Sequence, residues 1–545
     1  MADVWYRTGV STCPASGTRV ISTPSDPKCI HVWYTHADTN DTNEVGASYG
    51  HGFGDGTDAL SCCIAAVDGG TTTRRQGAGA IGGTDAIMLI LDPANQATPF
   101  VVGTTAAMNA NDITISFSTF TNGKIFHWEA FGGTDVTANI TLILNIAAAT
   151  NSPWTHGLSS APDLLMFLTN GQGNWADNSI HSYLAFGVAH DNGASIDQWC
   201  LTTYMGDTGI GDGQGSGLTP AICAGQYDID FADWTNTVTV IGATTYTWTD
   251  VTPQADDMAV LAIDLSGIGV DVGTFTKATG GAPVDQDMPD LGFTPQGYHL
   301  ASANKTVTTR TANTDTGTFH GAVDESNDTG NSLGTVGAAG SEADRNARSN
   351  NAEVLFGSDG LDAGVDWSGT HATITDATPT INWNPNTANA VHIGYYAFET
   401  QVSGDILATP DLAFAVATAD LEARGKLDAT PDLVLSATAD LKASGKLDAT
   451  PDLIFSIPTA DLNALGKLDA TPDMAFSITA DLTARGKLDA TAAASFAVPN
   501  ADLRISCDQL LPPDAILVQT NLSGVVGDID EPVDAPDANW LLLSP

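Results

Sequence analysis

The chain has 545 residues, more than one hydrophobic core normally organises, so several domains are expected. Apolar residues make up 42% of it, an ordinary globular proportion that excludes wholesale disorder. Acidic side chains outnumber basic ones by 64 to 19, and the net charge of -45 argues against nucleic acid and anionic membranes as partners.

The acidity has two interpretations. The first is solubility at high local copy number. The second is divalent-cation binding, because Ca²⁺ prefers carboxylate oxygens. The acidic run at 38–44 alternates oxygen-bearing side chains but lacks the glycine and the terminal glutamate spacing of an EF-hand, so a solvated loop is favoured. We expect no cofactor, with Ca²⁺ as the alternative.

The cysteines are odd in number and irregularly spaced, and no CxxC pair occurs among them. This argues against a zinc knuckle and favours free buried thiols. The first residues lack the basic and apolar regions of a signal peptide, and no run of 18 apolar residues is present. We expect a protein that is made in the cytoplasm, needs no disulfides and does not insert into a membrane. The seven cysteines are Cys13, Cys29, Cys62, Cys63, Cys200, Cys223 and Cys507.

Two landmarks recur in the first 400 residues. A proline precedes an apolar strand three times, at separations of 135 and 133 residues: Pro27, Pro162 and Pro295. An alanine lies in the alternating strand that follows an aromatic residue and a polar turn, at separations of 132 and 135 residues: Ala130, Ala262 and Ala397. Two landmarks with one period indicate a large internal repeat.

Short β-rich runs separated by Gly, Asn, Asp and Thr lie between these landmarks, and no stretch has a sustained helical period. We therefore predict an all-β protein that begins with three tandem β-sandwich, jelly-roll-like domains at 1–138, 139–270 and 271–400.

A shorter repeat of 20 or 21 residues follows at 401–506. From Leu427 to Ala443 every odd position is apolar, and every even position except Val434 is polar or charged. This period of two predicts strands with one buried face. The extra residue of the longer units predicts β-bulges near 417 and 458, because a one-residue slip would turn every later side chain over.

One such unit cannot bury its own apolar face, so the units must stack on one another or pair with other chains. We expect a shaft or oligomerisation segment whose units fold back at Gly or Pro. The remaining residues, 507–545, are acidic and proline-rich, and they predict an extended arm or interface segment.

Three histidines occupy what the sequence suggests are matching places in the large repeats: His51, His190 and His320. A recurring titratable residue indicates a metal ligand or a pH switch. A packing role shared by the copies is favoured, because no HExxH or HxH pattern accompanies them.

Aromatic residues that recur with the repeats, if exposed, would stack on sugar rings of a receptor glycan. Core packing is favoured because they lie within alternating strands. They are Trp33, Trp128, Trp248, Trp383 and Tyr395.

No catalytic or cofactor-binding residue emerges. The glycine-rich run Gly206–Gly217 lacks the Gly-Lys-Ser/Thr ending of a phosphate loop, so it is interpreted as a surface loop. No Gly-x-Ser-x-Gly elbow is present, and paired carboxylates are unavoidable among 64 acids. We expect a protein that is not an enzyme.

Three segments resemble tailed-bacteriophage virion structural proteins. The opening Asp3–Gly9 looks like the start of many phage tail and fibre proteins. The segment 273–295 resembles a repeated module of phage structural proteins, and 521–540 is similar to a segment of phage virion proteins. The resemblance implies a structural role and transfers no catalytic residue.

The resemblance and the repeats together predict a component of the virion surface, assembled in the host cytoplasm, at the tail fibre or tail tip and used for host adsorption. The alternatives are a head decoration or capsid spike protein and a glycan-binding or glycan-degrading surface protein. Expected partners are other virion proteins, copies of the chain itself, with a trimer favoured, and a host surface glycan.

The short repeats generate a prediction about the isolated fragment 401–506. Because its alternation leaves an apolar face without a partner sheet, we expect it not to fold as a monomer. Analytical ultracentrifugation and circular dichroism of the purified fragment check this. A soluble monomer that melts cooperatively would contradict it.

Overall fold

The computed structural model describes residues 4–399 and, between 404 and 518, the backbone of the strands alone. Within 4–399 it leaves out only these segments: 15–16, 43, 67–72, 79–85, 96–97, 120, 122, 144–151, 171–177, 180–181, 206–213, 226–233, 251–256, 304–315, 326, 338–344, 351, 358–364, 375–376 and 388–389.

The chain divides into two compact units, Ala2–Gln401 and Val402–Pro545 with Met1. Every regular element in the described residues is a β-strand, so the all-β prediction is confirmed. Accordingly, the described part contains no helix long and apolar enough to cross a membrane.

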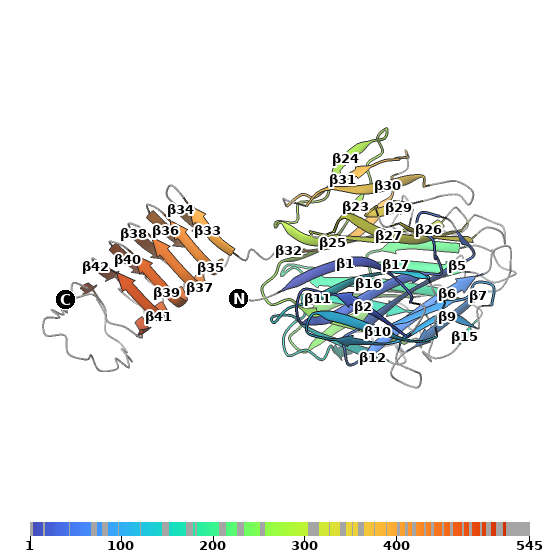
Figure 1. The fold of residues 1–545 in the computed structure, drawn as a ribbon, viewed down its shortest axis with the longest axis horizontal. Coiled ribbons are helices and arrows are strands. Elements are labelled where there is room, and N and C mark those ends of the chain that lie inside the picture. The colour runs from blue at the N-terminus through green and yellow to red at the C-terminus, as the bar shows by residue number, and fades with distance from the viewer. Residues whose placement is uncertain are drawn as a thin grey trace. The chain divides into compact units, whose positions relative to one another are not determined.

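The unit Ala2–Gln401 contains three pairs of sheets (Figure 1). In the first pair the larger sheet has the order β1-β11-β3-β5-β6-β7 and the smaller one β2-β10-β9-β8. Their bounds are β1 Trp5–Thr12, β2 Thr18–Ser22, β3 Pro27–Thr35, β5 Ala47–Gly54, β6 Ala59–Ala66, β7 Thr73–Ala78, β8 Met88–Leu91, β9 Pro99–Met108, β10 Asp112–Thr119 and β11 Ile125–Gly132.

The second pair repeats this strand order as β12-β22-β14-β16-β17-β18 and β13-β21-β20-β19. Its strands are β12 Thr137–Ile143, β13 Ser152–Thr155, β14 Leu164–Thr169, β16 Ser182–Asp191, β17 Ile196–Met205, β18 Gln214–Thr219, β19 Cys223–Gly225, β20 Trp234–Ile241, β21 Thr245–Asp250 and β22 Met258–Asp264.

The third pair repeats it again as β23-β32-β25-β26-β27-β28 and β24-β31-β30-β29. Its strands are β23 Val270–Thr276, β24 Val284–Asp287, β25 Pro295–Ser302, β26 Thr316–Asp324, β27 Asn327–Gly337, β28 Arg345–Asn350, β29 Leu355–Gly357, β30 Trp367–Thr373, β31 Thr380–Trp383 and β32 His392–Glu399. The predicted division into three domains stays a prediction, because the three pairs lie within one compact unit.

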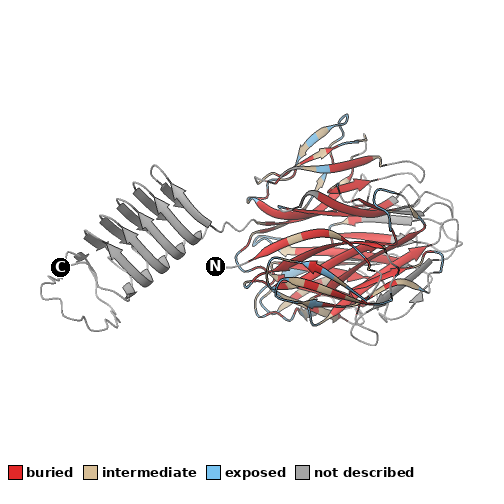
Figure 2. Ribbon diagram, in the orientation of Figure 1, coloured by how far each residue is buried: buried red, intermediate tan, exposed pale blue. Residues whose placement is uncertain are grey.

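The central strands of the larger sheet in each pair are buried on both faces, and we call this sheet the inner sheet. Strands such as β5, β11 and β25 are buried at every residue (Figure 2). In β3, Ile30 and Val32 pack toward the smaller, outer sheet, whereas Cys29 and Trp33 face the other way. The nearly unbroken apolar sequence of these strands follows from this double burial.

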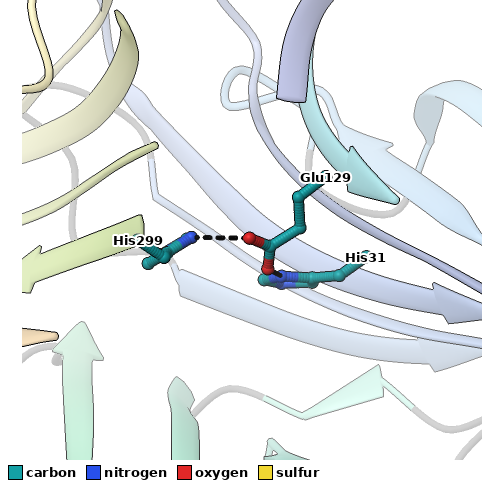
Figure 3. Close-up of side chains that lie close together, drawn as sticks. All are labelled: His31, Glu129 and His299. Carbon is teal, nitrogen blue, oxygen red and sulfur yellow. Dashed lines mark hydrogen bonds and ion pairs between the residues drawn. The ribbon is translucent and has the colours of Figure 1, made fainter. Parts of the chain in front are cut away.

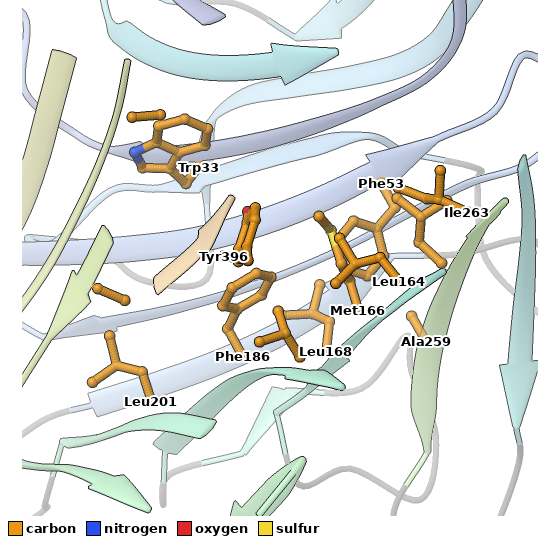
Figure 4. Close-up of a cluster of buried hydrophobic side chains, with 14 of the residues drawn as sticks. Trp33, Phe53, Leu164, Met166, Leu168, Phe186, Leu201, Ala259, Ile263 and Tyr396 are labelled. Atoms are coloured by element: carbon orange, nitrogen blue, oxygen red, sulfur yellow. The ribbon is translucent and has the colours of Figure 1, made fainter. Parts of the chain in front are cut away.

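The second faces of the three inner sheets meet in one hydrophobic cluster, which we call the common core. It takes buried side chains from all three pairs, among them Trp33, Met166, Phe186 and Tyr396 (Figure 4). Each pair also keeps a separate cluster between its own inner and outer sheets. The pairs are therefore joined by apolar burial, the dominant favourable term in folding.

The register places the sequence landmarks at equivalent positions. On the strands that follow the prolines, Ile30 pairs with Ala130, Leu165 with Ala262, and Tyr298 with Ala397. Three glycines of the next strand are equivalent as well, because a Cβ added to any of them would lie 1.7 or 1.8 Å from a backbone carbonyl oxygen. These are Gly52 against Ile87, Gly187 against Ile222 and Gly321 against Val354.

Two short strands cross between the pairs. Strand β15 (Asn178–Ser179), from the second pair's segment, pairs with β7 of the first. Strand β4 (Glu44–Val45), from the first pair's segment, pairs with β28 of the third. Both cover an edge strand that would otherwise present unpaired backbone groups.

The unit Val402–Pro545 contains two parallel sheets of six strands each. One runs β33 Gly404–Ala408, β35 Leu421–Ala429, β37 Leu441–Ala449, β39 Leu462–Ala470, β41 Leu482–Ala490 and β43 Leu503–Cys507. The other runs β34 Leu412–Val416, β36 Asp432–Ala437, β38 Asp452–Ile457, β40 Asp473–Ile478, β42 Ala493–Ala497 and β44 Ile516–Val518.

Each 20- or 21-residue unit contributes one strand to each parallel sheet, so equal residues stand side by side, as Gly445 does with Gly425 and Gly466. The predicted bulges near 417 and 458 lie outside the described residues. The paired strands on either side keep their register. Part of the predicted arm 507–545 is a strand, β44, and the rest of it beyond Cys507 is outside the described residues.

The close approach at Gly52 generates a prediction. In Gly52→Ala the new Cβ would collide with backbone, which cannot rotate away, so the free energy of unfolding should fall by more than about 3 kcal/mol. Urea unfolding measures it. Gly281→Ala is the control, because a Cβ there meets nothing within 4 Å. Equal stability of the two variants would contradict the assigned packing.

Candidate functional site

Five titratable side chains lie together in the common core with no exposed surface. We call them the carboxylate cluster: His31, His51, Glu129, His299 and His320. The first pair supplies three of them, from β3, β5 and β11, and the third pair supplies two, from β25 and β26. The cluster therefore joins two segments that are far apart in the sequence.

The Glu129 carboxylate is the centre of the cluster (Figure 3). Its Oε1 lies 2.7 Å from His31 Nδ1, and its Oε2 lies 3.3 Å from His299 Nδ1. Tyr6 donates its hydroxyl to Oε2 at 2.8 Å, and Tyr396 donates its hydroxyl to Oε1. The two oxygens thus have four donors, which matches the acceptor capacity of an ionised carboxylate.

Each histidine that contacts Glu129 also contacts a second histidine through its other ring nitrogen. His31 Nε2 lies 2.8 Å from His51 Nδ1, and His51 Nε2 lies 2.5 Å from the Tyr49 hydroxyl. On the other side His299 Nε2 lies 3.0 Å from His320 Nδ1. His320 Nε2 is buried and has no hydrogen-bond partner among the described residues.

The proton positions follow from the carboxylate. An ionised Glu129 only accepts, so His31 and His299 both carry their proton on Nδ1. Their Nε2 atoms then accept from His51 and His320, and His51 Nε2 accepts from Tyr49. With one proton on each histidine, Glu129 gives this arrangement a single negative charge.

Burial and neighbouring charge set the titration of the cluster. Burial opposes ionisation of Glu129, but the attraction of His299 and His31 in their protonated forms, together with the hydrogen bonds that they donate, outweighs it and lowers the pKa of Glu129. Burial lowers the pKa of His31, against the opposing effect of Glu129. Burial, reinforced by the neighbouring histidines, places the pKa values of His51 and His320 well below the ordinary range.

Aromatic rings enclose the cluster. Phe186, from the second pair, stacks on His31 and on His51 with ring centroids 4.8 and 4.7 Å apart. Tyr396 stacks on His299 at 4.8 Å. These contacts exclude water, which strengthens every electrostatic interaction inside.

In the second pair, the positions equivalent to the cluster histidines and to Glu129 are occupied by apolar residues. Counting from the equivalent glycines, the position of His51 and His320 is filled by Phe186. The same register makes Met166 the counterpart of His31 and His299. Leu261, which pairs with Met166, corresponds to Glu129.

His190 is therefore not the third member of the histidine set that the sequence suggested. It lies four residues beyond Phe186 on β16, is partly exposed, and its Nδ1 contacts the backbone oxygen of Asp163 at 2.7 Å. The sequence comparison matched a histidine with histidines, whereas the residue that follows Pro162 by 24 positions, as His51 follows Pro27, is Phe186.

Further polar contacts join the first and third pairs beside the cluster. His127 contacts Asn331 at 3.0 Å and Ser349 at 2.7 Å. The backbone of Tyr6 donates to Gln296, and that of Thr8 donates to Asp324. Buried polar groups with partners on both sides fix one relative position of the two sheets.

The acidic run at 38–44 is held by cations and backbone groups. Lys124 Nζ lies 3.1 Å from an oxygen of Asp38 and 3.7 Å from one of Glu44. Glu44 also accepts from the backbone of Asp38 and Thr39, and Arg348 pairs with Asp41. These carboxylates already have partners, and Ca²⁺ binding here stays a prediction.

The other sequence candidates have clear positions. The recurring aromatics are all buried, so core packing is confirmed for Trp33, Trp128, Trp248, Trp383 and Tyr395. In the glycine-rich run, 206–213 lies outside the described residues and the rest begins strand β18. The five cysteines with described side chains are buried and form no disulfide: Cys13, Cys29, Cys62, Cys63 and Cys200.

The sequence reasoning missed Glu129 as a site residue. A signal was present, because it is the one acid in the otherwise apolar and aromatic strand Ile125–Gly132. Its donor atoms and those of His31 and His299 all lie within 4.8 Å of one another, so these three side chains form a candidate metal-binding group.

Comparisons with known proteins identify no relative of this chain on which a function could be based. No protein-family model matches the chain, and no curated protein matches it. Among solved structures, a TodX monoaromatic hydrocarbon channel deltaS2 mutant is 10% identical over 71% of this chain and 91% of that chain, with a TM-score of 0.07. A score this low carries no argument about fold or function.

The buried carboxylate generates a prediction about stability. Glu129→Leu would leave four buried donors without an acceptor, so the free energy of unfolding should fall by about 3–5 kcal/mol. Glu129→Gln keeps the shape and one acceptor oxygen, so it should fall by about 1–3 kcal/mol. Urea unfolding in the presence of a chelator measures both.

The matched control is Glu325→Gln, an acid that is partly exposed in its pair with Arg7. Its effect should stay within about 0.5 kcal/mol. A Glu129→Leu protein as stable as this control would show that the carboxylate does not hold the cluster together.

Proposed function

We propose that the chain is a non-enzymatic structural component of a tailed-phage particle. In this proposal it is exposed on the virion surface at the tail fibre or tail tip, and it contributes to host adsorption. Its partners are other virion proteins, further copies of the chain and a host surface glycan.

The repetition of one strand order carries the proposal. Three sheet pairs of the same order share one core within a single chain, which gives a rigid body with three similar outer sheets. Loops of such a body present broad surfaces, and many copies on one particle compensate for weak single contacts by avidity.

The second unit supports the same role. Its two parallel sheets grow by one strand each per 20- or 21-residue unit, so the number of units sets the length of the stack. A stack that lengthens as units are added suits a structural protein, such as the shaft of a fibre. The net charge of -45 favours solubility at the high local concentration of an assembling particle.

Two alternative functions also fit the observed fold. The same repeated sheets suit a head decoration or capsid spike protein. A glycan-binding or glycan-degrading surface protein would need its sugar site on the loops, because the recurring aromatic residues are buried and cannot stack on a sugar.

Localisation on the particle tests the proposal. An epitope inserted between Gly193 and Ala194, in an exposed hairpin turn, should leave the core intact. Gold-labelled antibody should then mark the tail end of negatively stained particles, with untagged particles as the control. Label spread over the shell would favour decoration, and absence of the chain from washed particles would contradict a virion role.

An adsorption assay separates attachment from scaffolding. Antibody bound to the inserted epitope should slow attachment to host cells, because it obstructs the loop surface. Turnover of host polysaccharide by the purified full-length chain would instead favour the enzyme alternative.

A further inference from the structure

We propose that the common core contains a binding site for a divalent transition-metal ion of the zinc class, with His31, Glu129 and His299 as ligands. The site would bind its ion within the fold, between the first and third sheet pairs, as a structural centre. It is independent of where the protein acts.

The donor set has the right chemistry. Two imidazole nitrogens and a carboxylate oxygen are preferred ligands of Zn²⁺ and of neighbouring first-row ions. All three side chains are fully buried, and their donor atoms lie within 4.8 Å of one another. The Tyr6 and Tyr396 hydroxyls donate hydrogen bonds to the same carboxylate and hold it in place.

The two nitrogen-to-oxygen distances, each to a different oxygen of Glu129, are close to those of a tetrahedral site, whereas the two imidazole nitrogens, within 4.8 Å of each other, must also come to about 3.3 Å. Zn–N and Zn–O bonds of about 2.0–2.1 Å in a tetrahedron place neighbouring ligand atoms about 3.3 Å apart. His299 Nδ1 already lies 3.3 Å from Glu129 Oε2. His31 Nδ1 lies 2.7 Å from Oε1, so it must withdraw by about half an ångström to admit an ion.

The outer histidines provide the surroundings that a metal-bound imidazole needs. A ligating histidine almost always donates its other ring N–H to an acceptor, which fixes its orientation and tautomer. His51 lies 2.8 Å from His31 Nε2, and His320 lies 3.0 Å from His299 Nε2. With metal on both Nδ1 atoms, each histidine keeps one proton but changes tautomer. His31 and His299 then carry their proton on Nε2 instead of Nδ1 and donate it to Nδ1 of His51 and His320, which carry theirs on Nε2, so both hydrogen bonds reverse direction.

Packing alone does not account for the cluster. The second pair fills the corresponding positions with Met166, Phe186 and Leu261, all buried in the same common core. The fold therefore accepts apolar residues there. Replacing buried charges with apolar groups is often neutral or stabilising, so a charged set in a dry core favours a specific role. An ion also offsets the buried negative charge of Glu129.

Metal analysis of the full-length chain tests the proposal. Protein purified without chelator, or stripped and reloaded with Zn²⁺ alone, should contain about one tightly held ion per chain. X-ray absorption at the zinc edge should show nitrogen and oxygen neighbours at about 2.0–2.1 Å, with the outer-shell scattering of two imidazoles. This readout needs no variant.

A paired substitution gives the specific test. His31→Met with His299→Met introduces the residue that the second pair carries at the equivalent position, and it should reduce bound Zn²⁺ at least tenfold in folded protein. His190→Gln is the control and should retain the ion. Folded wild-type chain that binds no Zn²⁺, equal binding by the double variant, or sulfur neighbours at about 2.3 Å from cysteine ligation would each overturn the proposal.

Discussion

The buried carboxylate of Glu129 is the interaction on which the meeting of the first and third sheet pairs depends. It accepts from His31 on its own sheet and from His299 and Tyr396 on the other. An ionised group costs several kcal/mol to bury unless every lone pair has a donor. The two sheets are therefore restricted to the one relative position that supplies these donors, and apolar burial around them provides the driving force.

The second pair shows the other way to build the same core. It keeps the strand order and the close glycine contact, but Phe186 and Met166 replace histidines. Stacking of Phe186 on His31 and His51 closes the cluster from that side. Repetition thus fixes the backbone, whereas the side chains at the centre differ between copies. In the proposed particle, the repeated sheets would therefore set the shape of this unit, and the polar side chains of the first and third pairs would distinguish its centre.

Local patterns in the sequence predicted the strands well. The prolines and alanines of the long repeat fall at equivalent register positions, and the period of two after Leu427 corresponds to paired strands. The common core was harder to foresee. An apolar run such as Pro27–Thr35 indicates burial on both faces, but it does not identify what covers the second face.

The cluster itself depends on contacts between Glu129 and residues as distant as Tyr396, which no local period encodes. The mismatch at His190 has a simpler origin, because residues were matched by type, whereas the backbone register and the distance from Pro162 both identify Phe186 as the equivalent residue.

Native-state hydrogen exchange of the full-length chain tests the central claim, that three sheet pairs depend on one core. Peptides from β3, β14 and β25 should open with a common free energy that declines together as guanidinium is added, because these strands all bury a face in the common core. One pair that opens at a lower free energy while the other two stay protected would contradict the claim.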